Sequence, residues 1–268
     1  MRYDRVAEEY EATAVPWFTP LADDLVDRVC RGLVVRRFVD LGAGTGLVAG
    51  LARQRLGKSV GIVALDPAVG MLTRTRSEVG AELVAGAAPG LPFRDACFDA
   101  VAANLALSHV VELEPALADM TRLLRPLGRL GVSAWASPPG PGDGDQRRDV
   151  DALIEEVAAG WRLDSAPPRP AARWDEKLRD PVFLRHRCEA AGLTGVEVEH
   201  VAYRQELPVE VRLTGWEGRS RYRRAVAGED RWAAFLDAAR ARVREEFGDT
   251  MLAADRFLIA TGTARSAP

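Results

Sequence analysis

The chain has 268 residues, which is enough for one α/β domain with an insertion and for a sizeable buried core. Its 47% hydrophobic and 28% charged residues are ordinary for a globular protein and exclude a disordered chain. A net charge of −3 disfavours a nucleic-acid partner, and three widely spaced cysteines without Cys/His ligand spacing disfavour a disulfide framework and a metal site.

The first 30 residues carry charged and apolar positions at helical spacing, interrupted by Pro16 and Pro20. Because proline interrupts helical hydrogen bonding, we expect two short helices here. The segment lacks the apolar run of a signal peptide, and no stretch of the chain approaches the ~18 continuous apolar residues of a membrane span. These features predict a soluble cytoplasmic protein that is neither exported nor bound to a membrane.

From Phe38 onward, apolar runs alternate with helical patterns. This alternation predicts a parallel sheet covered by helices. The expected strands lie at 38–41, 60–65, 82–85, 98–104 and 129–135, and the expected helices at 47–56, 69–79 and 114–124.

Two clusters rich in proline mark the segment after residue 137 as an excursion from the sheet. They are SPPGPGDGD at 137–145 and APPRP at 166–170, and a helix is expected between them at 149–161. Beyond them we expect a helix at 181–191, a strand at 196–203, two helical stretches and a last strand near 256–261.

The sequence FVDLGAGTG predicts a ligand-binding loop. It places Asp40 at the end of a strand and glycines 42, 44 and 46 where the chain turns into a helix. Glycine allows positive φ and close approach of a ligand, and the helix N-terminus offers free N–H groups. A dinucleotide site needs the order GxGxxG, but Leu47 occupies the slot of its third glycine. A carboxylate at Asp40 also suits an amino-acid ammonium better than a pyrophosphate, which favours adenosylmethionine.

A second carboxylate ends the next expected strand, in ALDP. Asp66 could accept two hydrogen bonds from ribose hydroxyls. Because this contact would serve NAD and adenosylmethionine equally, it does not discriminate between the two. A nucleotide-dependent oxidoreductase therefore stays as a weaker alternative.

Five motifs in order resemble those of class I S-adenosylmethionine-dependent methyltransferases of the ubiquinone/menaquinone-biosynthesis-like group. The motifs are YDRVAEEYE at 3–11, DLGAGTG at 40–46, ALDPAVGML at 64–72, LPFRDACFDAV at 91–101 and LLRPLGRLGVSAW at 123–135. This resemblance implies an α/β fold, with a Rossmann-like, seven-stranded, mostly parallel sheet that has helices on both faces, plus a helical lid or insertion.

The resemblance also predicts how the chain is divided. Residues 1–35 would form an N-terminal helical lid, and residues 36–137 the S-adenosylmethionine-binding core. Residues 138–180 would be an insertion that caps the acceptor, and residues 181–268 would complete the sheet and add a helical substrate lid.

The cofactor-binding residues follow from the same resemblance. The methionine end of S-adenosyl-L-methionine would be held by Asp40, Gly42, Gly44 and Gly46, with Ala43 in the same loop. Asp66 would bind the ribose beside Pro67, Met71 would cover one adenine face, and Tyr10 would close over the site.

Two further parts of the implied site lie after the third and fourth strands. The family often has an acidic residue after strand three for the adenine amino group, but this chain has glycine and two alanines at 86–88. Backbone groups of Ala87 and Ala88 would take its place. Asn104, Leu105 and His109 would lie under the sulfonium, at the crevice where open α/β sheets bind ligands.

His109 is the candidate catalytic residue, because a histidine can accept a proton near neutral pH. Equally, it could only line the pocket, since alignment alone can accelerate an in-line methyl transfer. Tryptophans 135, 161, 174 and 216 could likewise line an aromatic acceptor pocket or fill the core.

The predicted function is S-adenosylmethionine-dependent methyl transfer to an O, N or C nucleophile of a small molecule, a specialised metabolite of secondary metabolism. The alternative is a methyltransferase-like protein that binds the cofactor without methyl transfer, for a cyclisation, a rearrangement or a structural role. The expected partner is a small-molecule acceptor, with neither nucleic acid nor membrane, and the sequence says nothing about oligomeric state.

Overall fold

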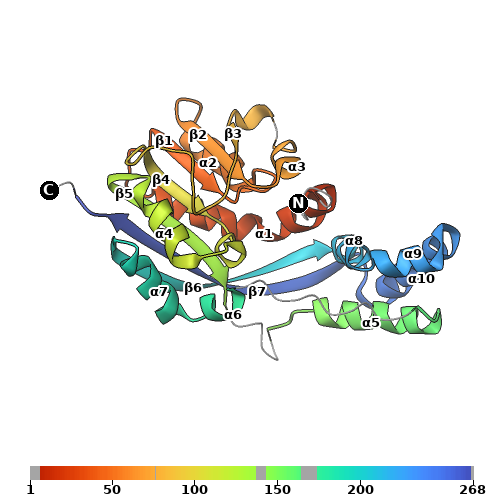
Figure 1. Ribbon diagram of the computed structural model, residues 1–268. Coiled ribbons are helices and arrows are strands. Elements are labelled where there is room, and N and C mark those ends of the chain that lie inside the picture. The colour runs from red at the N-terminus through yellow and green to blue at the C-terminus, as the bar shows by residue number, and fades with distance from the viewer. Residues whose placement is uncertain (1–6, 76, 137–142, 164–173, 267–268) are drawn as a thin grey trace.

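A computed structural model describes residues 7–75, 77–136, 143–163 and 174–266. The start of the first motif, most of the first proline-rich cluster and all of the second lie outside these residues. Within them, the secondary structure is a seven-stranded sheet with helices on both faces (Figure 1). The predicted α/β architecture is therefore confirmed.

The sheet has the strand order β3-β2-β1-β4-β5-β7-β6. The first five strands run parallel, and β7 runs antiparallel to both of its neighbours. The strands are β1 Arg37–Leu41, β2 Gly61–Asp66, β3 Glu82–Ala85, β4 Phe98–Ala103, β5 Leu124–Trp135, β6 Leu193–Pro208 and β7 Thr250–Ala264. Central strands β1 and β4 are buried along almost their whole length, as expected for parallel strands covered on both faces.

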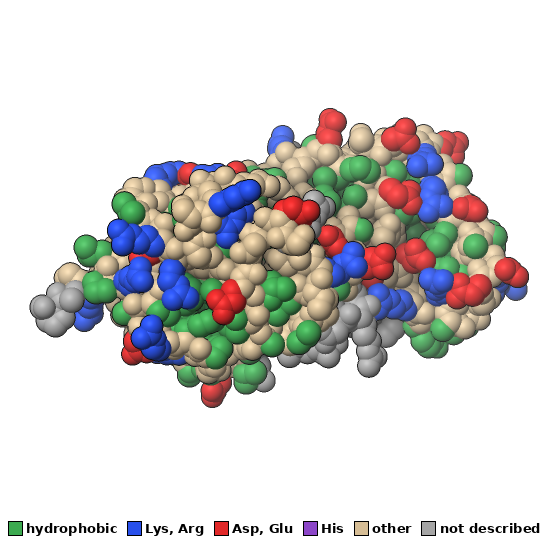
Figure 2. Space-filling model, turned by 90° about the horizontal axis from the view of Figure 1, so that it is seen from above, with side chains coloured by type: hydrophobic (Ala, Val, Ile, Leu, Met, Phe, Trp, Pro, Cys, Tyr) green, Lys and Arg blue, Asp and Glu red, His purple; other side chains and the backbone are tan. Residues whose placement is uncertain are grey.

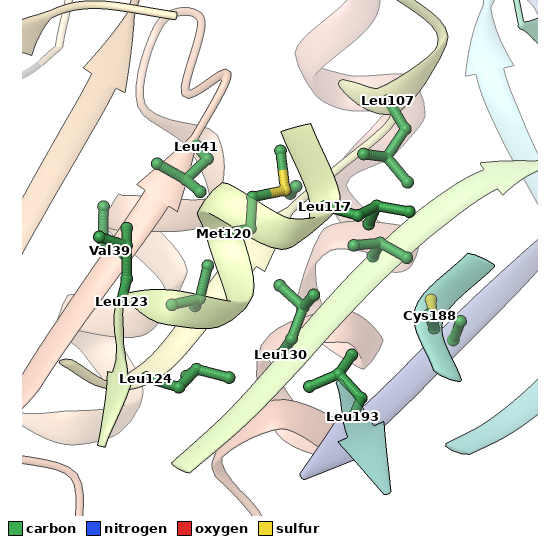
Figure 3. Packing of buried hydrophobic residues seen from close by; sticks show 14 of the residues in the cluster. Val39, Leu41, Leu107, Leu117, Met120, Leu123, Leu124, Leu130, Cys188 and Leu193 are labelled. Atoms are coloured by element: carbon green, nitrogen blue, oxygen red, sulfur yellow. The ribbon is translucent and has the colours of Figure 1, made fainter. Parts of the chain in front are cut away.

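One face of the sheet is covered by α1 (Ala7–Cys30) and α2 (Leu47–Leu56), and the other by α4 (Leu113–Arg122) and α7 (Pro181–Ala190). Figure 3 shows how leucines of α4 and β5 meet on the second face, with Met120 and Cys188 among them. The shorter helices are α3 Val69–Leu72 and α6 Asp175–Leu178.

A second, smaller core lies at the outer ends of β6 and β7 (Figure 1). It packs α5 (Arg147–Gly160), α8 (Val209–Arg219) and α10 (Glu229–Phe247) around Trp232, and α9 (Arg221–Ala227) joins the last two. Figure 2 shows acidic and basic side chains mixed over this end of the molecule. No helix among the described residues is long and apolar enough to cross a membrane.

The prediction of two short N-terminal helices was wrong, because α1 is one helix with Pro16 and Pro20 inside it. Its second half is anchored by buried apolar residues, among them Leu21, Leu25 and Val29. Burial of this apolar stripe stabilises the helix and offsets the hydrogen bonds that the two prolines cannot donate.

Several other expected boundaries were also wrong, including the start of β5, which lies at Leu124 and not at residue 129. The helix expected at 69–79 is only α3 followed by a 3-10 turn at Ser77–Val79, because the segment buries little beyond Met71 and Leu72. Strands β6 and β7 extend well past the expected ranges, since each continues beside its partner to the antiparallel pair of Pro208 with Thr250. Three helices, and not two, connect them, since Gly228 with φ +81° separates α9 from α10.

Candidate functional site

The loop after β1 contains three glycines with left-handed backbone. Their φ angles are +71° at Gly42, +55° at Gly44 and +84° at Gly46. A Cβ on Gly42 would lie 2.6 Å from the Cβ of Ala106, and one on Gly46 would lie 2.7 Å from the methyl carbon of Thr75. Both backbone conformation and steric limits therefore require glycine in this loop.

Backbone hydrogen bonds tie this loop to the end of β2. The N–H groups of Gly42 and Ala43 donate to the carbonyl of Leu65 at 2.8 and 3.0 Å. The N–H of Gly44 donates to Oδ2 of Asp66 at 2.9 Å. The two motifs that the sequence singled out thus lie side by side at a fixed spacing.

Asp40 is almost completely buried, with 1% of its surface exposed. Its Oδ2 accepts a hydrogen bond from the N–H of Ala49 at 3.0 Å, while its Oδ1 has no hydrogen-bond partner among the described residues. Burial raises the pKa of this carboxyl to about 7, against the lowering effect of the Ala49 hydrogen bond, and the charge of Asp66 raises it further. The free oxygen is an acceptor that a cationic donor would satisfy.

Asp66 connects two loops through its carboxylate. Its Oδ1 accepts from the N–H of Ala68 at 2.7 Å, and its Oδ2 accepts from Gly44. Because each carboxylate oxygen has two lone pairs, both keep capacity for a ligand hydroxyl. Pro67, next in the chain, is exposed.

The beginning of α1 lies against these loops. Ala7 and Tyr10 pack with Ala68 and Met71 in one small apolar cluster. A Cβ on Gly44 would lie 3.5 Å from the terminal methyl of Met71 and 3.8 Å from a ring carbon of Tyr10. The fold therefore brings Tyr10 and Met71 to the glycine loop from two different elements.

The segment after β3 approaches the same region. Gly86 donates a backbone hydrogen bond to the carbonyl of Asp66 at 3.3 Å, so Ala87 and Ala88 follow directly beside that residue. Ala87 is exposed, and Ala88 is half-buried against the main core.

The loop after β4 is positioned by a residue that sequence reasoning missed. Ser133 of β5, 1% exposed, donates through its hydroxyl to Oδ1 of Asn104 at 2.6 Å and accepts from the N–H of Leu105 at 2.9 Å. Leu105 has φ +54°, a conformation that needs such support in a residue with a side chain. The signal available in the sequence was a lone hydroxyl inside an otherwise apolar strand.

His109 ends a 3-10 turn, Leu107–His109, and its side chain is exposed. Its N–H donates to the carbonyl of Ala106 at 3.1 Å. The candidate base is thus on the same loop as Asn104 and Leu105, but at its solvent side.

Two hollows follow one another beyond the end of β5. The first is a small crevice lined by Leu105, Ser108, Ser133 and Trp135, with Asp175 at its other side. The second has a volume of about 200 Å³ and is lined by Trp135 together with arginine and aspartate side chains. Trp135 contributes to the lining of both, so the two hollows are neighbours.

The four tryptophans that the sequence singled out have different surroundings. Trp135 lines the two hollows. Trp216 is buried in the second core and stacks on Trp232 with ring centroids 6.1 Å apart, and Trp161 packs in that core against Phe235. Trp174 is half-buried, and its indole N–H donates to the carbonyl of Val110 at 3.0 Å.

Comparisons with known proteins agree with this geometry. Residues 39–132 match the family described as "Methyltransferase domain". Nocamycin O-methyltransferase from Saccharothrix syringae is 30% identical over 227 residues, which cover 81% of this chain and 79% of that protein. Demethylmenaquinone methyltransferase from Clavibacter sepedonicus is 32% identical over 209 residues, covering 73% of this chain and 82% of that one.

A solved structure shows the same fold. Phosphoethanolamine N-methyltransferase 2 from Haemonchus contortus, in complex with S-adenosyl-L-methionine, superposes with a TM-score of 0.54 at 12% identity. The match covers 98% of this chain and 57% of that one.

The sheet order, the glycine loop and these relatives define one class, and the chain belongs to the class I S-adenosylmethionine-dependent methyltransferases. It is an enzyme that uses S-adenosyl-L-methionine as methyl donor and acts on a small molecule. Family, fold, enzyme class and cofactor are all as the sequence predicts.

Proposed function

We propose that this enzyme transfers the methyl group to an oxygen nucleophile of a specialised metabolite. The observation that carries this proposal is the length of the match to nocamycin O-methyltransferase. Its 227 aligned residues extend far beyond the cofactor-binding segment at 39–132 and so include parts of the chain that surround the larger hollow beyond β5. Acceptor choice depends on those parts, because the sheet edge itself is committed to the cofactor.

The proposed cofactor contacts use the groups described above. The free Oδ1 of Asp40 would accept from the ammonium, and the glycine loop at 42–46 would pass close to the methionine portion. Asp66 would bind the ribose hydroxyls, with Met71 and Tyr10 on the adenosine and the backbone of Ala87 and Ala88 at its edge. This arrangement fits the donor because it pairs a buried carboxylate with a cation and leaves lone pairs where hydroxyls are expected.

Methyl transfer requires alignment more than it requires an acid or a base. When bound, the cofactor supplies a methyl group on a cationic sulfur. The sulfur is a good leaving group when a nucleophile attacks the methyl carbon from the side opposite the carbon–sulfur bond. The chain's part is to hold the acceptor oxygen in line, and the Asn104–Leu105 turn, fixed by Ser133, is the rigid wall beside that point. His109 stays a candidate for removing the acceptor proton through its imidazole.

A location in the reducing cytoplasm belongs to the same proposal. All three cysteines are buried free thiols. Burial raises the pKa of Cys30 to about 11 and that of Cys188 to about 12, so neither thiol is reactive at neutral pH.

The test begins with calorimetric titration of S-adenosylmethionine, S-adenosylhomocysteine and NAD. A set of hydroxylated, aminated and carbon-acid acceptors then follows, with S-adenosylhomocysteine formation and product mass as readouts. We expect binding of the first two ligands and products methylated on oxygen. Products methylated only on nitrogen or carbon would refute the proposal that the nucleophile is oxygen. A rearranged product without S-adenosylhomocysteine would instead establish the alternative without methyl transfer.

A further inference from the structure

The larger hollow beyond β5 is lined by five arginines, which come from distant parts of the chain. They are Arg147, Arg148, Arg179, Arg212 and Arg256. Only two acidic residues, Asp145 and Asp255, line it among the described residues. The hollow therefore carries an excess of positive charge.

Three of the five arginines are already paired. Arg147 binds Asp145 at 2.5 Å and Asp255 at 2.8 Å, and both of those acids belong to the lining. Its guanidinium also lies over the ring of Trp17, 4.4 Å from the centroid. Arg147 is thus a buried part of the wall with its charge compensated.

The other two paired arginines use acids outside the lining. The Nε of Arg212 donates to Asp151 at 2.8 Å, with a second hydrogen bond between the same two side chains. Arg256 binds Asp143 at 2.8 Å. These pairs compensate the charges of Arg212 and Arg256, so the two side chains line the hollow without adding net charge to it.

Arg148 and Arg179 are different, because neither has an acidic partner in the part of the chain that the structure describes. Both side chains are exposed and line the hollow. One comes from the first turn of α5 and the other from the link between α6 and α7, so two separate elements contribute them. Because both guanidinium groups line one hollow without an acidic partner, their charges add to a positive potential there that favours an anion.

We propose that Arg148 and Arg179 bind an anionic oxygen group, a carboxylate or a phosphate ester, at one end of the methyl acceptor. The guanidinium fork matches both groups with paired hydrogen bonds. A hollow of about 200 Å³ is smaller than the ~300 Å³ at the lower end of small-molecule sites, so it takes one end of the acceptor and not the whole.

The position of the hollow connects the anion to the reaction. Trp135 lines both this hollow and the crevice beside Leu105 and Ser133, the turn at which the acceptor oxygen is expected. An acceptor bound by its acidic end would therefore extend along Trp135 toward the methyl group. This inference rests on the proposed function for its reaction, but the anion site itself is tested by binding.

The experiment uses the full chain saturated with S-adenosylhomocysteine. The probes are a fragment library of small hydroxylated compounds, each present as a carboxylic acid, a phosphate ester and an uncharged primary amide. Binding is measured by ligand-observed NMR and by calorimetry. The variants are Arg148→Gln, Arg179→Gln and the double variant, with Arg94→Gln as the control that removes an equal charge from an exposed arginine outside the hollow.

We expect wild type and Arg94→Gln to select acids or phosphates over amides. The double variant should bind those anions at least about tenfold more weakly and bind the amides unchanged, since it loses charge-assisted hydrogen bonds only. The ratio of the affinities for the carboxylic acids and the phosphate esters identifies which anion the site prefers. Absence of any selection in wild type, or selection that persists in the double variant, would overturn the proposal.

Methyl transfer is assayed separately, so that the two proposals can fail independently. If acceptors are methylated on oxygen but wild type and the double variant bind the anionic probes equally, the proposed function is supported and the anion site is refuted. If anions bind selectively but no acceptor in the set is methylated on oxygen, the anion site is supported and the proposed function is refuted.

Discussion

At the scale of single residues, Asp40 links cofactor binding to pH. Its pKa of about 7 lies above the value of about 3.8 that it has in an unfolded chain, so the folded protein favours the protonated acid. The raised pKa therefore costs folding stability as pH rises from about 4 to about 7. A cofactor ammonium would reverse this preference, because it stabilises the carboxylate.

We predict that the affinity for S-adenosylhomocysteine rises between about pH 6 and pH 7.5 as Asp40 loses its proton. Calorimetry in two buffers with different ionisation enthalpies should show proton release at the lower pH. Asp40→Asn keeps the shape and should remove both effects. A wild-type affinity that is flat over this range would mean that Asp40 only anchors α2 through Ala49.

Asp66 is proposed to bind the ribose, and it also holds two loops by accepting hydrogen bonds from the N–H groups of Gly44 and Ala68. A single substitution would remove both interactions at once. We predict that Asp66→Ala weakens cofactor binding by about 1.5–3 kcal/mol through lost hydrogen bonds to ribose. The check is a thermodynamic cycle in which the binding free energies of the cofactor and of an analogue without ribose hydroxyls are measured for wild type and variant. The analogue should bind wild type and variant almost equally. An equal loss for both ligands would assign the whole effect to the loops.

At the scale of elements, α1 and β5 meet without space for a side chain. A Cβ on Gly131 would lie 2.0 Å from a methyl carbon of Val29. Gly131→Ala should therefore destabilise the fold by about 1–3 kcal/mol in denaturant unfolding, and adding Val29→Ala should recover part of the loss. Gly160→Ala is the matched control, since a Cβ there meets no atom within 4 Å and should cost nothing. Equal stability of Gly131→Ala and wild type would refute this close packing.

The elements also show what the sequence could and could not predict. The parallel strands were predictable because strands buried on both faces are almost entirely apolar, as 60–65 is and as 38–41 is apart from Asp40. Helix α1 was not, because the proline signal is local, whereas the packing of Leu25 and Val29 that overrides it is tertiary. The outer half of β6 was missed because this half-exposed antiparallel strand carries polar residues such as Arg204 and Glu206.

The candidate site divides in the same way. Its glycines and two aspartates lie in short motifs at strand ends, so the sequence indicates them directly. Ser133 hydrogen-bonds to the backbone of Leu105, 28 residues earlier in the chain. The arginines of the hollow come from positions as distant as 148 and 256. No spacing in the chain could have predicted either arrangement.

At the scale of the whole molecule, the clusters on the two faces of the sheet are separate from the helical core at the outer ends of β6 and β7, which predicts two cooperative units. Trp232→Ala, in the second core, should cost about 3–5 kcal/mol there. We predict faster amide hydrogen exchange in α5, α8 and α10, lost methyl transfer and retained S-adenosylhomocysteine binding. Faster exchange in β1 and β4 as well would mean that the molecule unfolds as one unit.

Helix α1 contacts both the glycine loop and the wall of the larger hollow. Tyr10 packs at the glycine loop, Trp17 lies under Arg147 beside the acceptor hollow, and Val29 is fixed on β5. Tyr10 and Trp17 are about 10 Å apart along a helix. A cofactor that holds Tyr10 would thus also steady Trp17, which implies an order of loading: the acceptor should bind measurably in calorimetry only after S-adenosylhomocysteine. Equal acceptor affinity for the empty protein would show that the two ligands load independently.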